Sequence, residues 1–169
     1  MTLSMYQASV PCFIRMLGNL SKILDKAVAH AAAKKIDPTV FVNARLAPDM
    51  FPLSRQIQIA TDGVKGCAAR LAGVEIPVYA DTESTFPELQ TRVTKTIDFL
   101  KSLRATQIDG SEERDVTLKL RGKETRFKGQ IYLLSFVIPN FYFHVTTAYA
   151  ILRHNGVEIG KSDYLGDFE

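Results

Sequence analysis

Apolar residues recur at alternating steps of three and four along the last long stretch of the chain, from about residue 131 to residue 152. This spacing places them on one face of an α-helix, in the pattern typical of a seam between packed helices. Such a helix is stabilised mainly by the elements that cover its apolar face, so partner helices are required elsewhere in the chain. The stripe consists of Ile131, Leu134, Ile138, Phe141, Val145, Ala148 and Leu152.

Three earlier segments have the same spacing, over about residues 4–33, 49–73 and 85–104. In the second, Asp49 is a candidate N-terminal cap and Gly73 suits the left-handed position that ends a helix. Their apolar stripes are Phe13, Leu17, Leu20, Leu24, Ala27 and Ala31; Leu53, Ile57, Ala60, Val64, Cys67 and Leu71; and Leu89, Val93, Ile97 and Leu100.

The period changes to two between the third and fourth helical segments. Val116, Leu118 and Leu120 alternate with polar residues, and the chain turns at Gly122 before it returns through residues 125–128. This pattern predicts a short β-hairpin with one apolar face, which must lie against the helices to be stable. The chain is therefore expected to form one all-α domain over residues 1–169, a four-helix bundle with a small hairpin between the third and fourth helices. The order of the helices around the bundle stays open.

Composition limits the classes of function. Apolar residues make up 46% and charged residues 23%, as in soluble globular proteins, and the absence of a continuous apolar run of bilayer length predicts no membrane span. The N-terminus lacks the pattern of a signal peptide, and Cys12 and Cys67 are expected to be buried free thiols, so we expect a cytoplasmic protein. The net charge of +3 is too small to indicate nucleic acid.

The hairpin concentrates cations, but no aromatic residues alternate with them, so charged strand edges are a better explanation than a nucleic-acid surface. The cations are Lys119, Arg121, Lys123, Arg126 and Lys128.

Two stretches, LAPDMFPLSRQIQIATD and PNFYFHVTTAYAILRHNGVEIGKSDYLG, together with the hairpin between them resemble a bacterial domain-of-unknown-function family within the DinB/YfiT-like four-helix bundles. The resemblance implies a pocket among the helices. In many members of that superfamily the pocket holds a divalent metal on three histidines, and some members are thiol-dependent transferases or isomerases. It places His144 and Asn140 on the histidine pair of the fourth helix. The histidine of the second helix falls near residues 58–60, where this chain has none.

His144 lies beside the apolar seam of the last helix, on a face that it shares with Asn140 and Thr147. Gln56, near the start of the second helix, is a further candidate for the same polar pocket. One histidine with amides and a hydroxyl is a poor zinc site, so no metal or other cofactor is assigned; if a divalent metal binds, His144 is its ligand. His154 is about 15 Å further along the helix and cannot share an ion with it.

Two hypotheses follow. The first is a small-molecule-binding or scaffold bundle whose polar pocket contains Gln56, Asn140, His144 and Thr147 and whose superfamily metal site is degenerate. The alternative is a divergent metal- or thiol-dependent transferase or hydrolase that uses His144 as a ligand or general base.

Two further features of the last helix bear on its shape and partners. Pro139 removes a backbone N–H and is expected to kink or restart the helix. Phe141, Tyr142 and Phe143 are consecutive, so at least one aromatic side chain should leave the core and could serve a homodimer interface.

Overall fold

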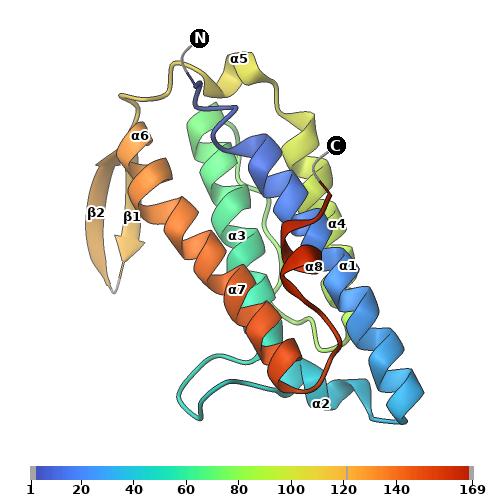
Figure 1. Ribbon diagram of the computed structural model, residues 1–169. Coiled ribbons are helices and arrows are strands. Elements are labelled where there is room, and N and C mark those ends of the chain that lie inside the picture. Colours follow the sequence, from blue (N-terminus) through green and yellow to red (C-terminus); the bar gives the residue numbers. More distant parts are fainter. Residues whose placement is uncertain (1–2, 121, 168–169) are drawn as a thin grey trace.

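A computed structural model describes residues 3–120 and 122–167 of the chain. Four long helices form its body: α1 (Val10–Lys34), α3 (Leu53–Ala72), α4 (Phe86–Ser102) and α7 (Ile138–His154) (Figure 1). Short helices α2 (Pro38–Asn43) and α5 (Ala105–Ile108) lie in the connections. The predicted all-α bundle is confirmed.

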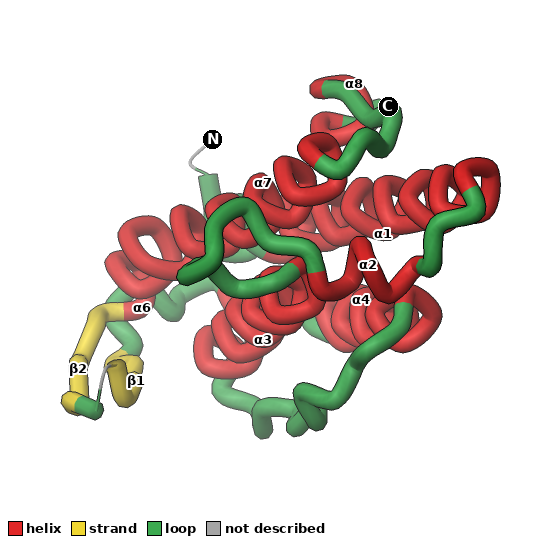
Figure 2. The backbone as a smooth tube through the Cα atoms, turned by 90° about the horizontal axis from the view of Figure 1, so that it is seen from below, coloured by secondary structure: helices red, strands yellow, loops and turns green. Residues whose placement is uncertain are grey.

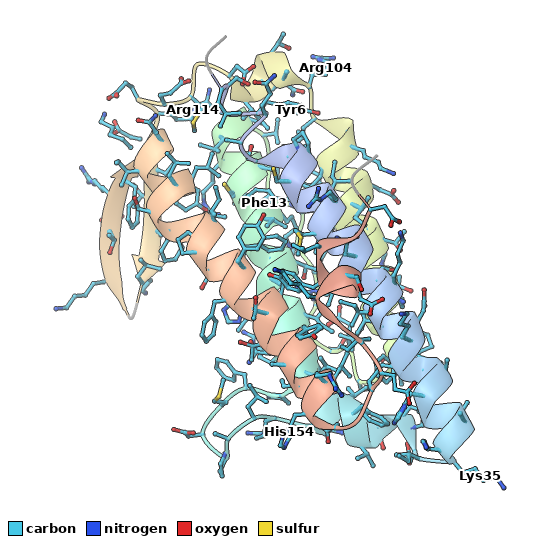
Figure 3. All side chains as sticks on the ribbon, viewed as in Figure 1. Tyr6, Phe13, Lys35, Arg104, Arg114 and His154 are labelled. Carbon is cyan, nitrogen blue, oxygen red and sulfur yellow. The ribbon has the colours of Figure 1, made fainter. Side chains whose placement is uncertain are left out.

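The order of the helices, which the sequence left open, follows from their contacts. Helix α3 packs most extensively on α7 and also contacts α4, whereas α1 packs on α4 and α7. The bundle therefore runs α1, α4, α3, α7 around its axis. Phe13 of α1 points toward α7 and meets the ring of Phe141 edge-on, with ring centroids 5.2 Å apart (Figure 3).

Helix boundaries follow the local signals in part. Helix α4 begins after Thr85, whose hydroxyl accepts from the N–H of Glu88 while the Glu88 carboxylate accepts from the N–H of Thr85. Gly73 ends α3 with a φ of 69°, as predicted. Asp49 does not cap α3, because the helix starts only at Leu53 after Pro52.

Two other predictions near the N-terminus were wrong. Helix α1 begins at Val10 rather than near residue 4, because the preceding residues form turns, in which the Ser9 hydroxyl bonds back to the carbonyl of Met5. Cys12 is exposed, since it lies on the outer face of the first turn of α1, whereas Cys67 is buried as expected.

The hairpin forms as predicted, from β1 (Asp115–Leu120) and β2 (Lys123–Lys128), with Val116 paired to Phe127. Figure 2 shows it at one side of the bundle, beside α6. Its turn residue at 121 lies outside the described residues.

The last long helix is continuous from Gly129 to His154, as α6 (Gly129–Ile131), the π-helix η1 (Tyr132–Val137) and α7. Its length and composition would allow it to cross a membrane, a property that it shares with the core helices of soluble proteins, and 44% of its most apolar window is buried in the bundle.

The π-helix shifts the apolar stripe of this helix. From Phe141 onward the predicted positions are buried, but Ile131 and Leu134 are exposed and Ile138 is half-buried. Tyr132, Leu133 and Val137 are buried instead. A π-helix accommodates one extra residue per turn, so the buried positions within η1 do not follow the spacing of a regular α-helix. The N–H of Ile138 bonds to the carbonyl of Leu133, five residues back.

The C-terminal residues fold back on the bundle. Helix α8 (Lys161–Leu165) lies against α1, where Lys26 Nζ is 2.6 Å from Asp163 Oδ1 and the Asn19 amide donates to the carbonyl of Tyr164.

Candidate functional site

His144 and Gln56 form a buried pair between α7 and α3. The distance from His144 Nδ1 to Gln56 Oε1 is 2.7 Å, and Gln56 Nε2 donates to the carbonyl of Phe51 at 3.0 Å. Because a carbonyl can only accept, the bond to Phe51 fixes the orientation of the amide, and Oε1 must face the histidine. Nδ1 therefore carries the proton and donates it. The other ring nitrogen, Nε2, keeps its lone pair.

The surroundings keep this imidazole neutral. Burial, and secondly the nearby Arg55 cation, lower the pKa of His144 below its ordinary value of 6.5. His144 is 8% exposed, and none of the residues in the described ranges hydrogen-bonds to its Nε2. A neutral imidazole with a free Nε2 lone pair can accept a proton or a hydrogen bond.

Asn140 and Thr147 lie on either side of His144 along α7. The Asn140 amide faces Gly63 of α3, with Nδ2 3.7 Å from where a Cβ of that glycine would be. The Thr147 hydroxyl donates back to the carbonyl of Phe143, and Thr147 lines a separate groove under Leu46 and Met50. The structure thus brings Gln56 and His144 together but places Asn140 and Thr147 on two different cavities.

Asn140 lines a cavity of about 500 Å³ between α3, strand β1 and η1, which we call the α3–η1 cleft. Its α3 wall extends from Arg55 to Arg70, roughly 22 Å along the helix axis. The lining residues are Arg55, Ile59, Asp62, Gly63, Arg70, Leu118, Lys119, Leu120, Tyr132, Phe136, Val137 and Asn140.

Two local features keep this cleft open. On α3, Gly63 leaves the floor of the cleft without a side chain. On the opposite wall, the π-helix turns Tyr132 and Phe136 toward the hairpin, and their rings stack at an angle of 18° with centroids 6.1 Å apart. The sequence predicted a break near Pro139 but could not locate it in η1.

The charges in the α3–η1 cleft differ in how they are neutralised. Asp62 pairs with Lys65 at 2.7 Å and with Arg92 at 2.8 Å, and Arg55 pairs with Asp81. The Nη1 of Arg70 donates to the hydroxyl of Tyr132 at 3.3 Å, and within the described part of the chain no carboxylate lies within ion-pair distance of Arg70.

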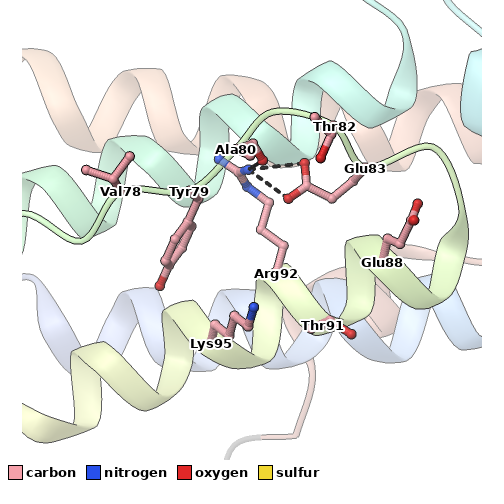
Figure 4. A pocket seen from close by; sticks show the side chains of 9 residues that line it. All are labelled: Val78, Tyr79, Ala80, Thr82, Glu83, Glu88, Thr91, Arg92 and Lys95. Carbon is pink, nitrogen blue, oxygen red and sulfur yellow. Dashed lines mark hydrogen bonds and ion pairs between the residues drawn. The ribbon is translucent and has the colours of Figure 1, made fainter.

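A second polar cluster, which the sequence analysis missed, surrounds Arg92 of α4. Its side chain is only 1% exposed and binds Thr61, the carbonyl of Ala80, and the carboxylates of Asp62, Asp81 and Glu83. Figure 4 shows the guanidinium reaching the connection between α3 and α4. One signal was available, since Arg92 lies three residues after the core residue Leu89 and so shares its buried face.

The adjoining cavity, about 320 Å³, lies between that connection and α4. The Lys65 ammonium lies over the ring of Tyr79, with Nζ 3.8 Å from the ring centroid. Since the carboxylates around Arg92 already neutralise it, this cluster is best explained as the attachment of residues 78–83 to the bundle.

The residues near His144 do not fit a metal held by three histidines. No group of three His, Cys, Asp or Glu side chains is close enough to hold an ion among residues 3–120 and 122–167. At the place of the second-helix histidine, Gln58 binds Arg55 and Glu83, and Ala60 is in the core. Nδ1 of His144 is already hydrogen-bonded to Gln56, and the nearby positive charge of Arg55 disfavours a metal ion at this histidine.

Residues 5–165 match the model of DUF1993, a domain of unknown function. A crystal structure of a DinB family member protein from Shewanella denitrificans is similar, with 42% sequence identity, a TM-score of 0.87, and coverage of 96% of this chain and 92% of that chain. No curated protein matches significantly. The chain belongs to the DUF1993 family and has the DinB-like fold.

Proposed function

We propose that this protein binds a small organic molecule in the α3–η1 cleft, and that the metal site of the superfamily is degenerate in it. The observation that carries the proposal is the π-helix η1, which brings Tyr132, Phe136 and Asn140 together opposite the glycine floor of α3. π-helical turns inside α-helices often mark functional sites.

The size and lining of the cleft suit such a ligand. Its volume of about 500 Å³ lies within the ~300–1,000 Å³ range of small-molecule sites. Phe136, Ile59 and Leu118 offer apolar surface, and the Asn140 amide has no hydrogen-bond partner within the described chain. Apolar walls with a few polar groups are typical of sites that orient small molecules.

A ligand screen by NMR tests this proposal. We expect compounds from a metabolite library to shift the backbone amide signals of Gly63 and its cleft neighbours. Gly63→Leu should abolish these shifts by filling the cleft. Gly18→Leu is the matched control, because it makes the same change in α1, where a Cβ meets nothing within 4 Å. Ligands that bind equally well to the Gly63→Leu protein would refute the cleft as the binding site.

The geometry of His144 favours a second candidate function, a divergent transferase or hydrolase. Gln56 holds the imidazole in the tautomer whose free Nε2 can act as a general base. In a screen of thiol-transfer and hydrolytic substrates, this hypothesis expects turnover that His144→Ala abolishes. Turnover that survives this substitution, or none with any substrate class, would count against it.

A further inference from the structure

Arg70 stands out among the buried and half-buried cations around α3, because no carboxylate of the described residues lies within ion-pair distance of it. The neighbouring acids are already used: Asp62 pairs with Lys65 and Arg92, and Asp81 with Arg55 and Arg92. A half-buried guanidinium without a counter-ion loses hydration without an ionic interaction to offset the loss. An anionic ligand would supply the missing charge.

The position of Arg70 is built into the fold. A Cβ at position 66 would lie 2.5 Å from Arg70 Nη1, so Gly66 provides the space in which the guanidinium lies along α3. Nη1 then reaches the Tyr132 hydroxyl at 3.3 Å. This is one of the five N–H donors of the guanidinium, which leaves others for a ligand.

Tyr132 adds a second donor beside Arg70. Its oxygen accepts the Arg70 bond, so its own O–H proton is directed elsewhere, and no acceptor for that proton is found among residues 3–120 and 122–167. Burial raises the pKa of Tyr132 to about 12, so the hydroxyl stays protonated at neutral pH. A guanidinium beside a phenol is suited to hold the oxygens of an anion.

The remainder of the cleft is suited to a flat apolar group. The Phe136 ring stacks beside that of Tyr132, and Gly63 leaves open floor on the facing helix. We propose that the ligand is an organic anion whose carboxylate, sulfonate or phosphate binds Arg70 and the Tyr132 hydroxyl, while its flat apolar part lies against Phe136. This inference rests on the function proposed above and specifies its ligand class.

A matched pair of fluorescent probes tests it. Anilinonaphthalene sulfonate carries an aromatic ring system with one anionic group, and phenylnaphthylamine is the same ring system without the sulfonate. In fluorescence titrations of the wild-type protein we expect the sulfonate to bind at least about tenfold more tightly than the neutral probe, since a charge-assisted hydrogen bond contributes about that factor or more. The advantage should shrink as salt is added.

Substitutions show which side chain is responsible for the preference for the sulfonate. Arg70→Gln should remove the preference for the sulfonate while leaving the neutral probe unaffected, and Tyr132→Phe should reduce it in part. Arg153→Gln is the control, because it removes the same charge from the exposed end of α7. The thermal midpoint of each variant reports whether it is folded, and Tyr132→Phe provides a second test if Arg70→Gln does not fold.

The two proposals fail in different ways. Equal affinities for both probes, or a loss in Arg70→Gln no larger than in Arg153→Gln, would overturn the anionic ligand and leave the cleft as a binding site. Binding of both probes that persists unchanged in Gly63→Leu would place them outside the cleft and overturn the proposed function as well.

Discussion

Gln56 determines which chemistry is open to His144. A carboxylate in its place would stabilise an imidazolium, whereas the neutral amide offers only a hydrogen-bond acceptor to Nδ1–H. The imidazole is therefore oriented but not made more basic. This arrangement suits a histidine that accepts a hydrogen bond from a bound ligand, and it also fixes the tautomer that a general base requires.

Gln56→Glu tests this account. The new carboxylate would face Nδ1–H, so the pKa of His144 should rise above its ordinary value of 6.5, whereas in the wild type it should lie below that value. An NMR pH titration of the histidine ring signals measures both, and His30 and His154 in the same spectra serve as references for resonance assignment. A His144 pKa that falls or does not change in the variant would contradict the pairing with Gln56.

Alanine substitutions at Gly63 and Gly129 should change the free energy of unfolding in opposite directions. Gly63→Ala should stabilise the protein by about 0.5–1 kcal/mol, because the position is inside α3 and the added Cβ comes no closer than 3.7 Å to Asn140. Gly129→Ala should destabilise it by about 1–3 kcal/mol, because the Cβ would lie 2.0 Å from the carbonyl oxygen of Ser111. Urea unfolding measures both free energies, and effects of the same sign would contradict the packing described.

At the scale of the elements, the conformation of the connection between α3 and α4 depends on side-chain contacts. Its backbone N–H groups over residues 75–83, all of them described, form no hydrogen bonds. Arg92 holds the segment through Ala80, Asp81 and Glu83. Side chains therefore hold this segment in place, and Arg92 acts together with the pairing of Arg55 with Asp81 and of Gln58 with Glu83.

Arg92→Met should destabilise the protein by about 1–3 kcal/mol, because the half-buried carboxylates of Asp62 and Glu83 lose a charge-assisted hydrogen bond. Lys95→Met is the control, since it removes the same charge from an exposed site on the same helix and should change stability by less than about 0.5 kcal/mol. Guanidinium unfolding gives both values. Losses of equal size would mean that the network contributes little.

The same elements show which features the sequence could predict. The start of α4 near residue 85 was predicted from local signals, and the structure shows that Thr85 and Glu88, close in sequence, cap the helix reciprocally. The π-helix was not, because apolar periodicity assumes 3.6 residues per turn and only the packing of η1 against α3 and the hairpin selects another period. The predicted stripe is therefore correct from Phe141 onward and wrong at Ile131 and Leu134.

At the scale of the whole molecule, the site was harder to predict than the fold. Gln56 and His144 were both selected from the sequence. They are 88 residues apart along the chain, so their contact depends on the pairing of α3 with α7. Arg70 was not selected from the sequence, because only the assembled bundle shows which of the described carboxylates lie within ion-pair distance of it. Periodicity predicts which face of a helix is buried, whereas charge balance requires knowledge of its neighbours.

The assembly state is the remaining expectation for the whole molecule. Phe143, in the run of three aromatics, is 56% exposed and lines an apolar groove with Leu46 and Met50. An exposed aromatic beside a groove is suited to an isologous contact in which each copy inserts its ring into the other. We expect a homodimer, with a light-scattering mass about twice the 18.8 kDa of one chain.

Phe143→Ser should shift the expected homodimer toward the monomer, because it removes the exposed ring that we place in the contact. Val78→Ser is the matched control, since it removes an apolar side chain that is 93% exposed on the connection between α3 and α4. Size-exclusion chromatography with light scattering over a range of concentrations measures both variants. A monomeric mass for the wild type at every concentration would contradict the dimer, and equal dissociation of both variants would contradict its placement at Phe143.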